Sequence, residues 1–335
     1  MAVSALTNGL PSPSPSPSPR SPSSARPKYI FKLCAGVPKN HGDGGASSMA
    51  APPADGETGT QVGDLPEECL ALAIALTSPR DACRAAAVSP AFRAAADSDA
   101  VWRRFLPDDL LAPGAANAGG GGGRKHAYLR LCDAANAAHV GGGGGCRVWV
   151  ERASGGRCYA VPARALSLPW DDGELSWRWT PHPRSRFGEV AELVSCTALD
   201  IHGRLPAAAA LTPATPYAAY LVYGTEEAHR GLSYPDQETA VAVGGGVVAR
   251  HAVCLCPGDD TAARRRSGLV VARGGRRPRR PAERGDGWWE MEMGRLCLGG
   301  GVGGEEEEVV ASFEVMGWHP KSGLIVEGIE FRPVG

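Results

Sequence analysis

Short apolar or alternating runs, separated by Gly, Pro and Asp, dominate the chain from Arg147 onward. Trp289–Met293 and Ile329–Arg332 alternate between apolar and charged residues, which predicts strands with one buried and one wet face. Tyr217–Tyr223 is apolar on both faces, which predicts a central strand. These patterns together predict an all-β sandwich. The runs are 147–150, 158–162, 177–180, 190–203, 217–224, 240–255, 287–296, 308–318 and 323–333.

A different pattern occupies residues 65–107, where capping residues precede short segments of apolar and basic residues. Asp64, Ser78, Ser89 and Ser98 stand in the positions that N-caps occupy, with proline or a carboxylate just after them. This pattern predicts a compact array of short helices. A unit of about forty residues rarely folds alone, so we expect its remaining apolar face to bury against a partner or a neighbouring domain.

Low-complexity segments divide the chain. Residues 1–63 are rich in Ser, Pro and Gly, a composition that predicts a disordered arm. Two polyglycine runs, 119–123 and 141–145, bracket a segment at 126–139 that we expect to be helical. The predicted organisation is an arm at 1–63, a helical unit at 64–107, a Gly-rich linker with one helix at 108–145 and a sandwich at 146–335.

Composition narrows the function classes. The formal net charge is -1, so no global field recruits nucleic acid or anionic lipid. A local run of arginines at 264–284 fits a solvated insertion loop better than a phosphate-binding patch. The ten cysteines show no zinc spacing, and no nucleotide or metalloprotease motif occurs, so we expect no cofactor and no metal. No apolar run is long enough for a membrane span, and no secretory signal is visible, which places the expected location in the cytoplasm or nucleus.

The helical unit resembles a known module. The string LPEECLALAIALTSPRDACRAAAVSPAFRAAADSDAVWRRFLP is similar to the F-box of a plant F-box family. That resemblance implies binding to a Skp-type adaptor, which connects F-box proteins to a cullin and a RING ubiquitin ligase. The adaptor-facing residues that it implies are Leu65, Pro66, Leu70, Ile74, Val88 and Trp102.

The β-rich region resembles the phloem protein two family and the tobacco agglutinin-like lectins. The resemblance rests on CYAVPARALSLPW, SWRW, EVAELVSCTALDIHGRL, TPYAAYLVY, DGWWEMEMG and KSGLIVEGIEFRP, in that order. It implies a jelly-roll-type sandwich, and several members of the family bind oligosaccharides that contain N-acetylglucosamine. The sugar-binding residues that it implies are Trp170, Trp177, Glu307 and Glu314.

The chemistry of these four residues suits a sugar, because aromatic rings pack on the C–H faces of sugars and carboxylates accept hydrogen bonds from hydroxyl groups. An alternative stays open: the tryptophans are core residues of the sandwich, and the glutamates are solvated. In a regular strand, Glu307 and Glu314 would point to opposite faces, because their spacing is odd. A turn or bulge between them would be needed for both to reach one site.

The sequence therefore predicts an α+β multidomain protein, with a short helical F-box followed by an all-β jelly-roll-type sandwich. Its expected function is a substrate-recruiting adaptor of a ubiquitin ligase, with no chemistry of its own. Its expected partners are a Skp-type adaptor, through it a cullin, and a glycan or glycoprotein. A lectin or scaffold outside any ligase is the second hypothesis. A glycoside hydrolase is the third, but it needs two carboxyl groups about 5 to 10 Å apart, which nothing in the sequence establishes.

Overall fold

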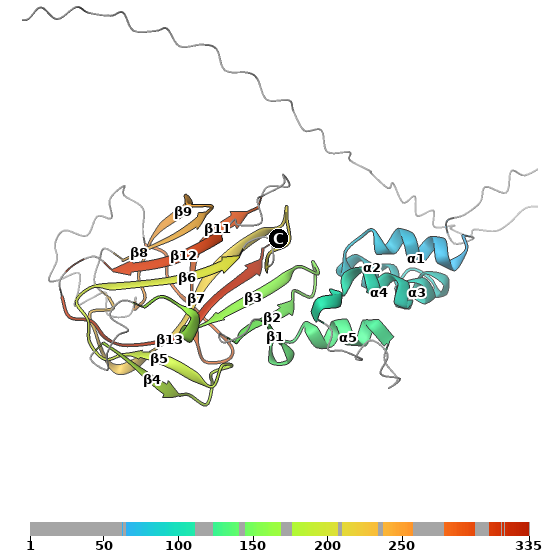
Figure 1. Cartoon of the computed structure of the whole chain (residues 1–335). Coiled ribbons are helices and arrows are strands. Elements are labelled where there is room, and N and C mark those ends of the chain that lie inside the picture. Colours follow the sequence, from blue (N-terminus) through green and yellow to red (C-terminus); the bar gives the residue numbers. More distant parts are fainter. Residues whose placement is uncertain are drawn as a thin grey trace, which may run out of the picture. The chain divides into compact units, whose positions relative to one another are not determined.

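The computed structural model describes residue 62 and residues 65–110, 123–140, 145–168, 176–206, 210–233, 237–256, 278–298, 308–315, 317 and 319–334. Over these residues, short helices come first and antiparallel strands follow, which confirms the predicted α+β class (Figure 1). The predicted arm lies outside the described residues, apart from Val62. The helices are α1 (Glu67–Ala75), α2 (Pro79–Ala85), α3 (Pro90–Asp97), α4 (Asp99–Phe105) and α5 (Gly123–Leu131), with 3-10 turns η2 (Asp108–Leu110), η4 (Ala134–Asn136) and η5 (Ala163–Ala165).

Side-chain caps start two of the helices as predicted. The Ser78 side chain accepts a hydrogen bond from the Asp81 amide at 3.1 Å, and the Ser89 side chain accepts one from the Phe92 amide at 3.3 Å. The prediction is wrong at Ser98, which occupies the N-cap position of α4 but makes no side-chain cap bond. The cap predicted at Asp64 lies outside the described residues, and Pro66 is the N-cap of α1.

The segment predicted as a helix at 126–139 divides into three elements. Helix α5 ends at Leu131, the 3-10 turn η4 follows, and β1 (Ala138–Val140) pairs with β2 (Cys146–Val150). The side chain of Asp133 accepts a hydrogen bond from the Ala135 amide at 2.9 Å. Such a local side-chain bond gives the backbone an alternative to further helix, which explains the early end of α5.

The helical region is fastened to the first strands. Buried residues of α1, α4 and α5 form one apolar cluster with Val148 and Val150 of β2. The Tyr128 hydroxyl donates to the carbonyl groups of Glu151 and Arg152, each at 3.2 Å. The predicted linker helix α5 is therefore part of a packed core that continues into the β-region.

Two antiparallel sheets make up the β-region. The nine-stranded sheet has the order β1-β2-β3-β13-β7-β11-β10, and β5 joins β4 to β13; the four-stranded sheet has the order β6-β12-β8-β9. The nine-stranded sheet further contains β3 (Arg157–Pro162), β4 (Trp177–Pro181), β5 (Glu189–Leu193), β7 (Pro216–Arg230), β10 (Ala282–Glu283), β11 (Trp289–Cys297) and β13 (Ser322–Pro333). The smaller sheet contains β6 (Leu199–Pro206), β8 (Gln237–Val243), β9 (Gly246–Val253) and β12 (Glu308–Val315).

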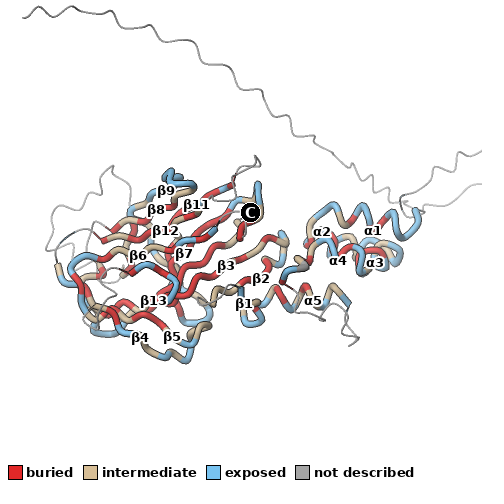
Figure 2. Tube along the Cα trace, viewed as in Figure 1, coloured by how far each residue is buried: buried red, intermediate tan, exposed pale blue. Residues whose placement is uncertain are grey.

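The core of the sandwich lies between the two sheets (Figure 1). Leu221 and Ile329 of the larger sheet belong to the same buried cluster as Ile201 and Phe313 of the smaller one. Figure 2 shows buried residues along β7 and β13, and β7 lies between β13 and β11, so the prediction that 217–223 is a central strand is confirmed.

Alternation predicts most of one strand correctly and another only in part. Met291 and Met293 are buried, and Glu290 and Glu292, which alternate with them, are partly exposed, as predicted. Trp289, which the alternation places on the buried face, is instead 38% exposed. In β13 the expectation of a wet face is wrong, because the Glu330 residue is only 1% exposed. Arg186 and Arg284 cover it from the outer side of the sheet and neutralise its charge.

Candidate binding sites

Helix α1 turns apolar residues to both of its sides. Leu70 and Ile74 enter the core of the helical region, whereas Leu72 and Leu76 are 67% and 75% exposed. Because Leu72 and Leu76 are four residues apart, their side chains neighbour each other on one side of the helix. Figure 2 shows exposed stretches along α1. We call the exposed apolar side chains of this region the apolar face, and its residues are Val62, Leu65, Leu72, Leu76 and Val88.

Half of the predicted adaptor-facing residues are buried rather than exposed. Leu65, Pro66 and Val88 are exposed, but Leu70, Ile74 and Trp102 are buried in the core of the helical region itself. Those three side chains hold the helices together, so the expectation that they face an adaptor is wrong.

The Trp102 ring is part of the core of the helical region. It is 1% exposed, its Nε1 donates to the Ala96 carbonyl at 2.7 Å, and its ring packs against Phe105 and Tyr128. The motif did not single out Leu72 and Leu76, although their spacing of four residues is a signal that could have separated them from Leu70 and Ile74.

A groove adjoins the apolar face. Its volume is about 400 Å³, and α1 and the start of α4 line it. Leu72 therefore both projects from the surface and borders a hollow, an arrangement that suits the insertion of an apolar side chain from a partner. The lining residues are Glu67, Glu68, Ala71, Leu72, Ala75, Ser98 and Ala100.

The four predicted sugar-binding residues do not form a common site over the described residues. Trp170 and Glu307 lie outside those residues. Trp177 is 3% exposed and belongs to the core of the sandwich. Its ring offers no surface for stacking, so the expectation of a sugar platform at Trp177 is wrong and the alternative of a core residue holds. Glu314 lies on β12 and is partly exposed on the face of the sheet that points away from the core.

The tryptophan next to that position in the SWRW sequence is more accessible. Trp179 is partly exposed, but the Arg164 guanidinium lies 3.9 Å from its ring centroid. Arg164 also donates to Glu189 at 2.9 Å. This cation–π contact occupies a face of the Trp179 ring that a sugar would need.

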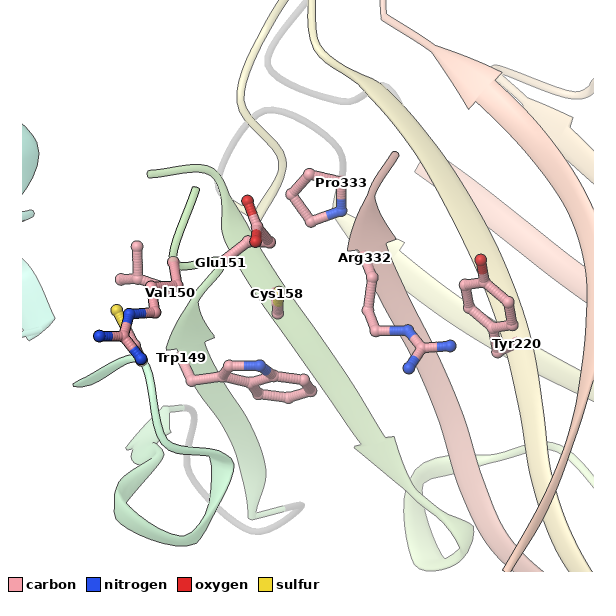
Figure 3. Close-up of a pocket in the computed structure, with 9 residues that line it drawn as sticks. Trp149, Val150, Glu151, Cys158, Tyr220, Arg332 and Pro333 are labelled. Atoms are coloured by element: carbon pink, nitrogen blue, oxygen red, sulfur yellow. The ribbon is translucent and has the colours of Figure 1, made fainter. Parts of the chain in front are cut away.

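A cavity of about 420 Å³ opens on the outer side of the larger sheet, next to Cys132, which directly follows α5 (Figure 3). The Arg332 guanidinium lies 3.8 Å from the Tyr220 ring centroid and donates to Glu290 at 2.7 Å. The polar groups at this end of the cavity are thus already paired. The lining residues are Cys132, Trp149, Val150, Glu151, Arg152, Cys158, Tyr220, Arg332 and Pro333.

Beside the cavity lies a network of buried charges. Glu330 is paired with Arg186, Arg284 and Arg332. Burial by itself raises the pKa of the Glu330 carboxyl, but the three positive charges outweigh it and hold that pKa below its ordinary value. Glu330 is therefore ionised, and the network ties β13 to the segments that carry the arginines.

The neighbouring Glu327 behaves in the opposite way. Its side chain is fully buried, and burial raises its pKa more than the Arg186 amide and charge lower it. Glu327 and Glu330 therefore respond to acid with opposite signs, although they lie on the same strand.

The structure describes part of the arginine run, and two of its arginines form ion pairs within the fold. Arg279 pairs with Glu292, and Arg284 pairs with Asp286, Glu290 and Glu330. These two arginines serve the fold. The rest of the run at 264–277 lies outside the described residues. Among the described helices, none has both the length and the apolar character needed to cross a membrane.

Comparisons with known proteins divide the chain in the same order as the fold. The F-box-like family matches residues 62–108, and the Phloem protein 2 family matches residues 156–333. The chain is 35% identical over 271 residues to F-box protein PP2-B10 of Arabidopsis thaliana, a match that covers 80% of this chain and 92% of that protein. It is 34% identical to putative F-box protein PP2-B8 of the same plant, covering 82% of this chain and 88% of the relative.

Solved structures show only distant likeness. A family 35 carbohydrate binding module from Clostridium thermocellum is 10% identical with a TM-score of 0.23, covering 50% of this chain and 97% of that one. The insecticidal delta-endotoxin Cry8Ea1 from Bacillus thuringiensis is also 10% identical, with a TM-score of 0.25, covering 47% of this chain and 22% of that one. Likeness at these scores carries no argument about fold or ligand.

Proposed function

The chain belongs to the family of plant F-box proteins that carry a phloem protein 2 domain, and from this membership we propose that it recruits substrates to a ubiquitin ligase of the Skp–cullin–F-box type. The helical region binds the Skp-type adaptor, which connects it to a cullin. The sandwich holds the protein to be ubiquitinated. The chain itself supplies binding surfaces and no catalytic group.

The apolar face is the observation that carries this proposal. Five apolar side chains remain in solvent on a region of about forty residues, although the same region buries Leu70, Ile74 and Trp102. Exposed apolar side chains that neighbour each other, as Leu72 and Leu76 do, mark a protein-binding site, because leaving them in water costs free energy that an interface recovers. The groove beside Leu72 gives a partner side chain a place to enter.

Calorimetric titration of the full chain with a Skp-type adaptor tests the proposal. We expect the double variant Leu72→Asp with Leu76→Asp to weaken binding at least tenfold, because apolar interface anchors commonly contribute roughly 2 kcal/mol or more each. Its melting temperature should stay within about 2 °C of the parent, because both side chains are exposed.

A matched control uses the other region. Val247 and Val248 on β9 are exposed apolar residues of the sandwich, so Val247→Asp with Val248→Asp makes the same chemical change away from the helices. That control should bind the adaptor as the parent does. Equal affinity of the parent and the Leu72/Leu76 variant would refute the assignment of the apolar face.

For the sandwich, we propose that the target carries an N-acetylglucosamine-type glycan. The support is the family match over residues 156–333 and the partly exposed carboxylate of Glu314, which can accept hydrogen bonds from sugar hydroxyls. Chitooligosaccharide titration at millimolar ligand, followed by NMR, should shift resonances in the parent and not in Glu314→Gln. Absence of any shift in the parent would mean that the sandwich recognises protein instead.

A further inference from the structure

The outer face of the smaller sheet gathers carboxylates from three strands. Glu314 of β12 lies directly opposite Asp200 of β6 on one side and opposite Glu238 of β8 on the other. Like charges directly opposite each other destabilise a sheet. Glu238 is paired with Arg250, whereas Glu314 has no ion pair within the described part of the chain.

A histidine completes the group. His202 is two residues beyond Asp200 on the same face of β6, since Leu199 and Ile201 both belong to the core. Its Nε2 lies 2.5 Å from Oδ1 of Asp200. One ligand atom each of Asp200, His202 and Glu314 can be chosen so that all three lie within 4.8 Å of one another.

Ser312 lies on the same outer face as the cluster. It lies directly opposite His202 on β12, and Ala311 and Phe313 on either side of it belong to the core, so its side chain shares the outer face with Glu314. Ser312 is only 8% exposed. A second observation concerns Asp200: although His202 Nε2 lies nearby, Oδ1 of Asp200 is buried and makes no hydrogen bond over the residues that the structure describes. A buried carboxylate oxygen of this kind normally has a partner.

From these contacts we propose that Asp200, His202 and Glu314 bind a divalent transition-metal ion of the Zn²⁺ class, with the Ser312 hydroxyl beside it. One imidazole nitrogen with two carboxylates suits Zn²⁺, whereas Ca²⁺ and Mg²⁺ prefer oxygen ligands alone. The cation offsets the repulsion between the two opposed carboxylates. Three protein ligands leave a coordination position for water or for a group of a bound target.

The two strands give the site a rigid frame. Eight consecutive residue pairs connect β12 to β6, from Glu308↔Pro206 to Val315↔Leu199. The ligands therefore keep their spacing without a flexible loop, as a metal site requires. This proposal shares Glu314 with the proposed sugar contact, and the two are tested separately, because the Zn²⁺ titration contains neither sugar nor adaptor.

Titration of the full, reduced and metal-stripped chain with ZnCl₂ tests the site. We expect His202→Ala and Glu314→Gln each to weaken one Zn²⁺ equivalent at least tenfold. Glu308→Gln is the matched control: it removes a carboxylate from the same strand but outside the cluster, where Glu308 pairs with Arg204. The control should bind Zn²⁺ as the parent does.

Thiols need a separate readout, since the chain has ten cysteines that can also bind Zn²⁺. Co²⁺ as a substitute probe distinguishes the two, because thiolate ligands give an intense near-ultraviolet charge-transfer band and imidazole and carboxylate ligands do not. We expect a Co²⁺ spectrum without that band, which His202→Ala reduces. Identical Zn²⁺ affinity and stoichiometry in all four proteins would refute the site, as would a parent that binds no Zn²⁺.

Melting temperatures measured with and without metal distinguish the loss of a metal ligand from misfolding of the variant. Without metal, Glu314→Gln should melt at the same temperature as the parent or higher, because it relieves the like-charge contact with Asp200. With Zn²⁺, the parent should gain melting temperature and the variant should not. A Glu314→Gln protein that gains as much as the parent would contradict the proposal.

Discussion

The helical region leaves some apolar side chains exposed, whereas the sandwich buries some charged ones. Helix α1 leaves Leu72 and Leu76 in solvent, whereas the sandwich covers the charged residues Lys321, Glu327 and Glu330. The Lys321 ammonium group donates to three backbone carbonyls at 2.8 to 3.0 Å, so even this buried cation is fully engaged. The helical region exposes several apolar side chains on a small unit, whereas the sandwich pairs the charges that it buries and, over its described residues, exposes few apolar side chains, Val247 and Val248 among them.

The largest expected effect concerns the helical core. Trp102→Ala removes a ring that is 1% exposed, and such truncation costs about 3 to 5 kcal/mol. We expect amide hydrogen exchange in α1 and α4 of the full chain to accelerate accordingly, while Leu76→Ala changes it little. If Trp102→Ala keeps the protection of the helices and weakens only adaptor binding, then the ring faces the adaptor and the distinction between core and apolar face fails.

The next effect concerns the buried charges of the sandwich. Glu330→Gln removes the carboxylate that compensates Arg186 and Arg284, a change expected to cost about 3 kcal/mol of unfolding free energy at neutral pH. Because the pKa of Glu330 is lowered in the fold, its contribution exists above the pKa of the unfolded chain and disappears as pH falls through the folded value.

Denaturant unfolding at several pH values therefore sharpens the comparison. The difference between the parent and Glu330→Gln should shrink as the solution is acidified. Glu327→Gln should behave oppositely: its raised pKa means that ionisation costs stability as pH rises, so the substitution should be neutral or stabilising at neutral pH. A Glu330→Gln penalty that is constant down to strong acid would exclude an ionised Glu330.

The smallest expected effects distinguish the serines that cap a helix through their side chains from the one that does not. Ser78→Ala and Ser89→Ala each remove a cap hydrogen bond and should lower helix stability by about 1 kcal/mol. Ser98→Ala should cost almost nothing, because that hydroxyl is buried without a partner among the described residues. Exchange rates at the first turns of α2, α3 and α4 measure all three. Equal losses at the three serines would contradict the capping geometry.

Sequence patterns predicted what depends on local spacing. The caps at Ser78 and Ser89 and the alternation at 290–293 follow from nearest neighbours along the chain, and the structure confirms them. Resemblance to a motif marked Leu70 as adaptor-facing, because a motif records which positions matter and not whether they serve the core or the surface. Leu70 and Leu72 have the same side chain, and only packing tells them apart.

The group at Asp200, His202 and Glu314 lay beyond the reach of sequence patterns for a different reason. Asp200 and His202 belong to β6, and Glu314 belongs to β12, which follows much later in the chain. Only the register between these strands brings the three together, and no local spacing encodes that register. The burial of Trp177 is similar, since its core position depends on how the two sheets meet.

Hydrogen exchange of the full chain with and without a Skp-type adaptor tests most directly the claim that the helical region, and not the sandwich, is the adaptor-binding surface. We predict slower exchange across α1, α2 and the turn that carries Val88 in the complex, and unchanged exchange in β6, β7, β12 and β13. Protection confined to the sandwich, with the helices unchanged, would contradict the account.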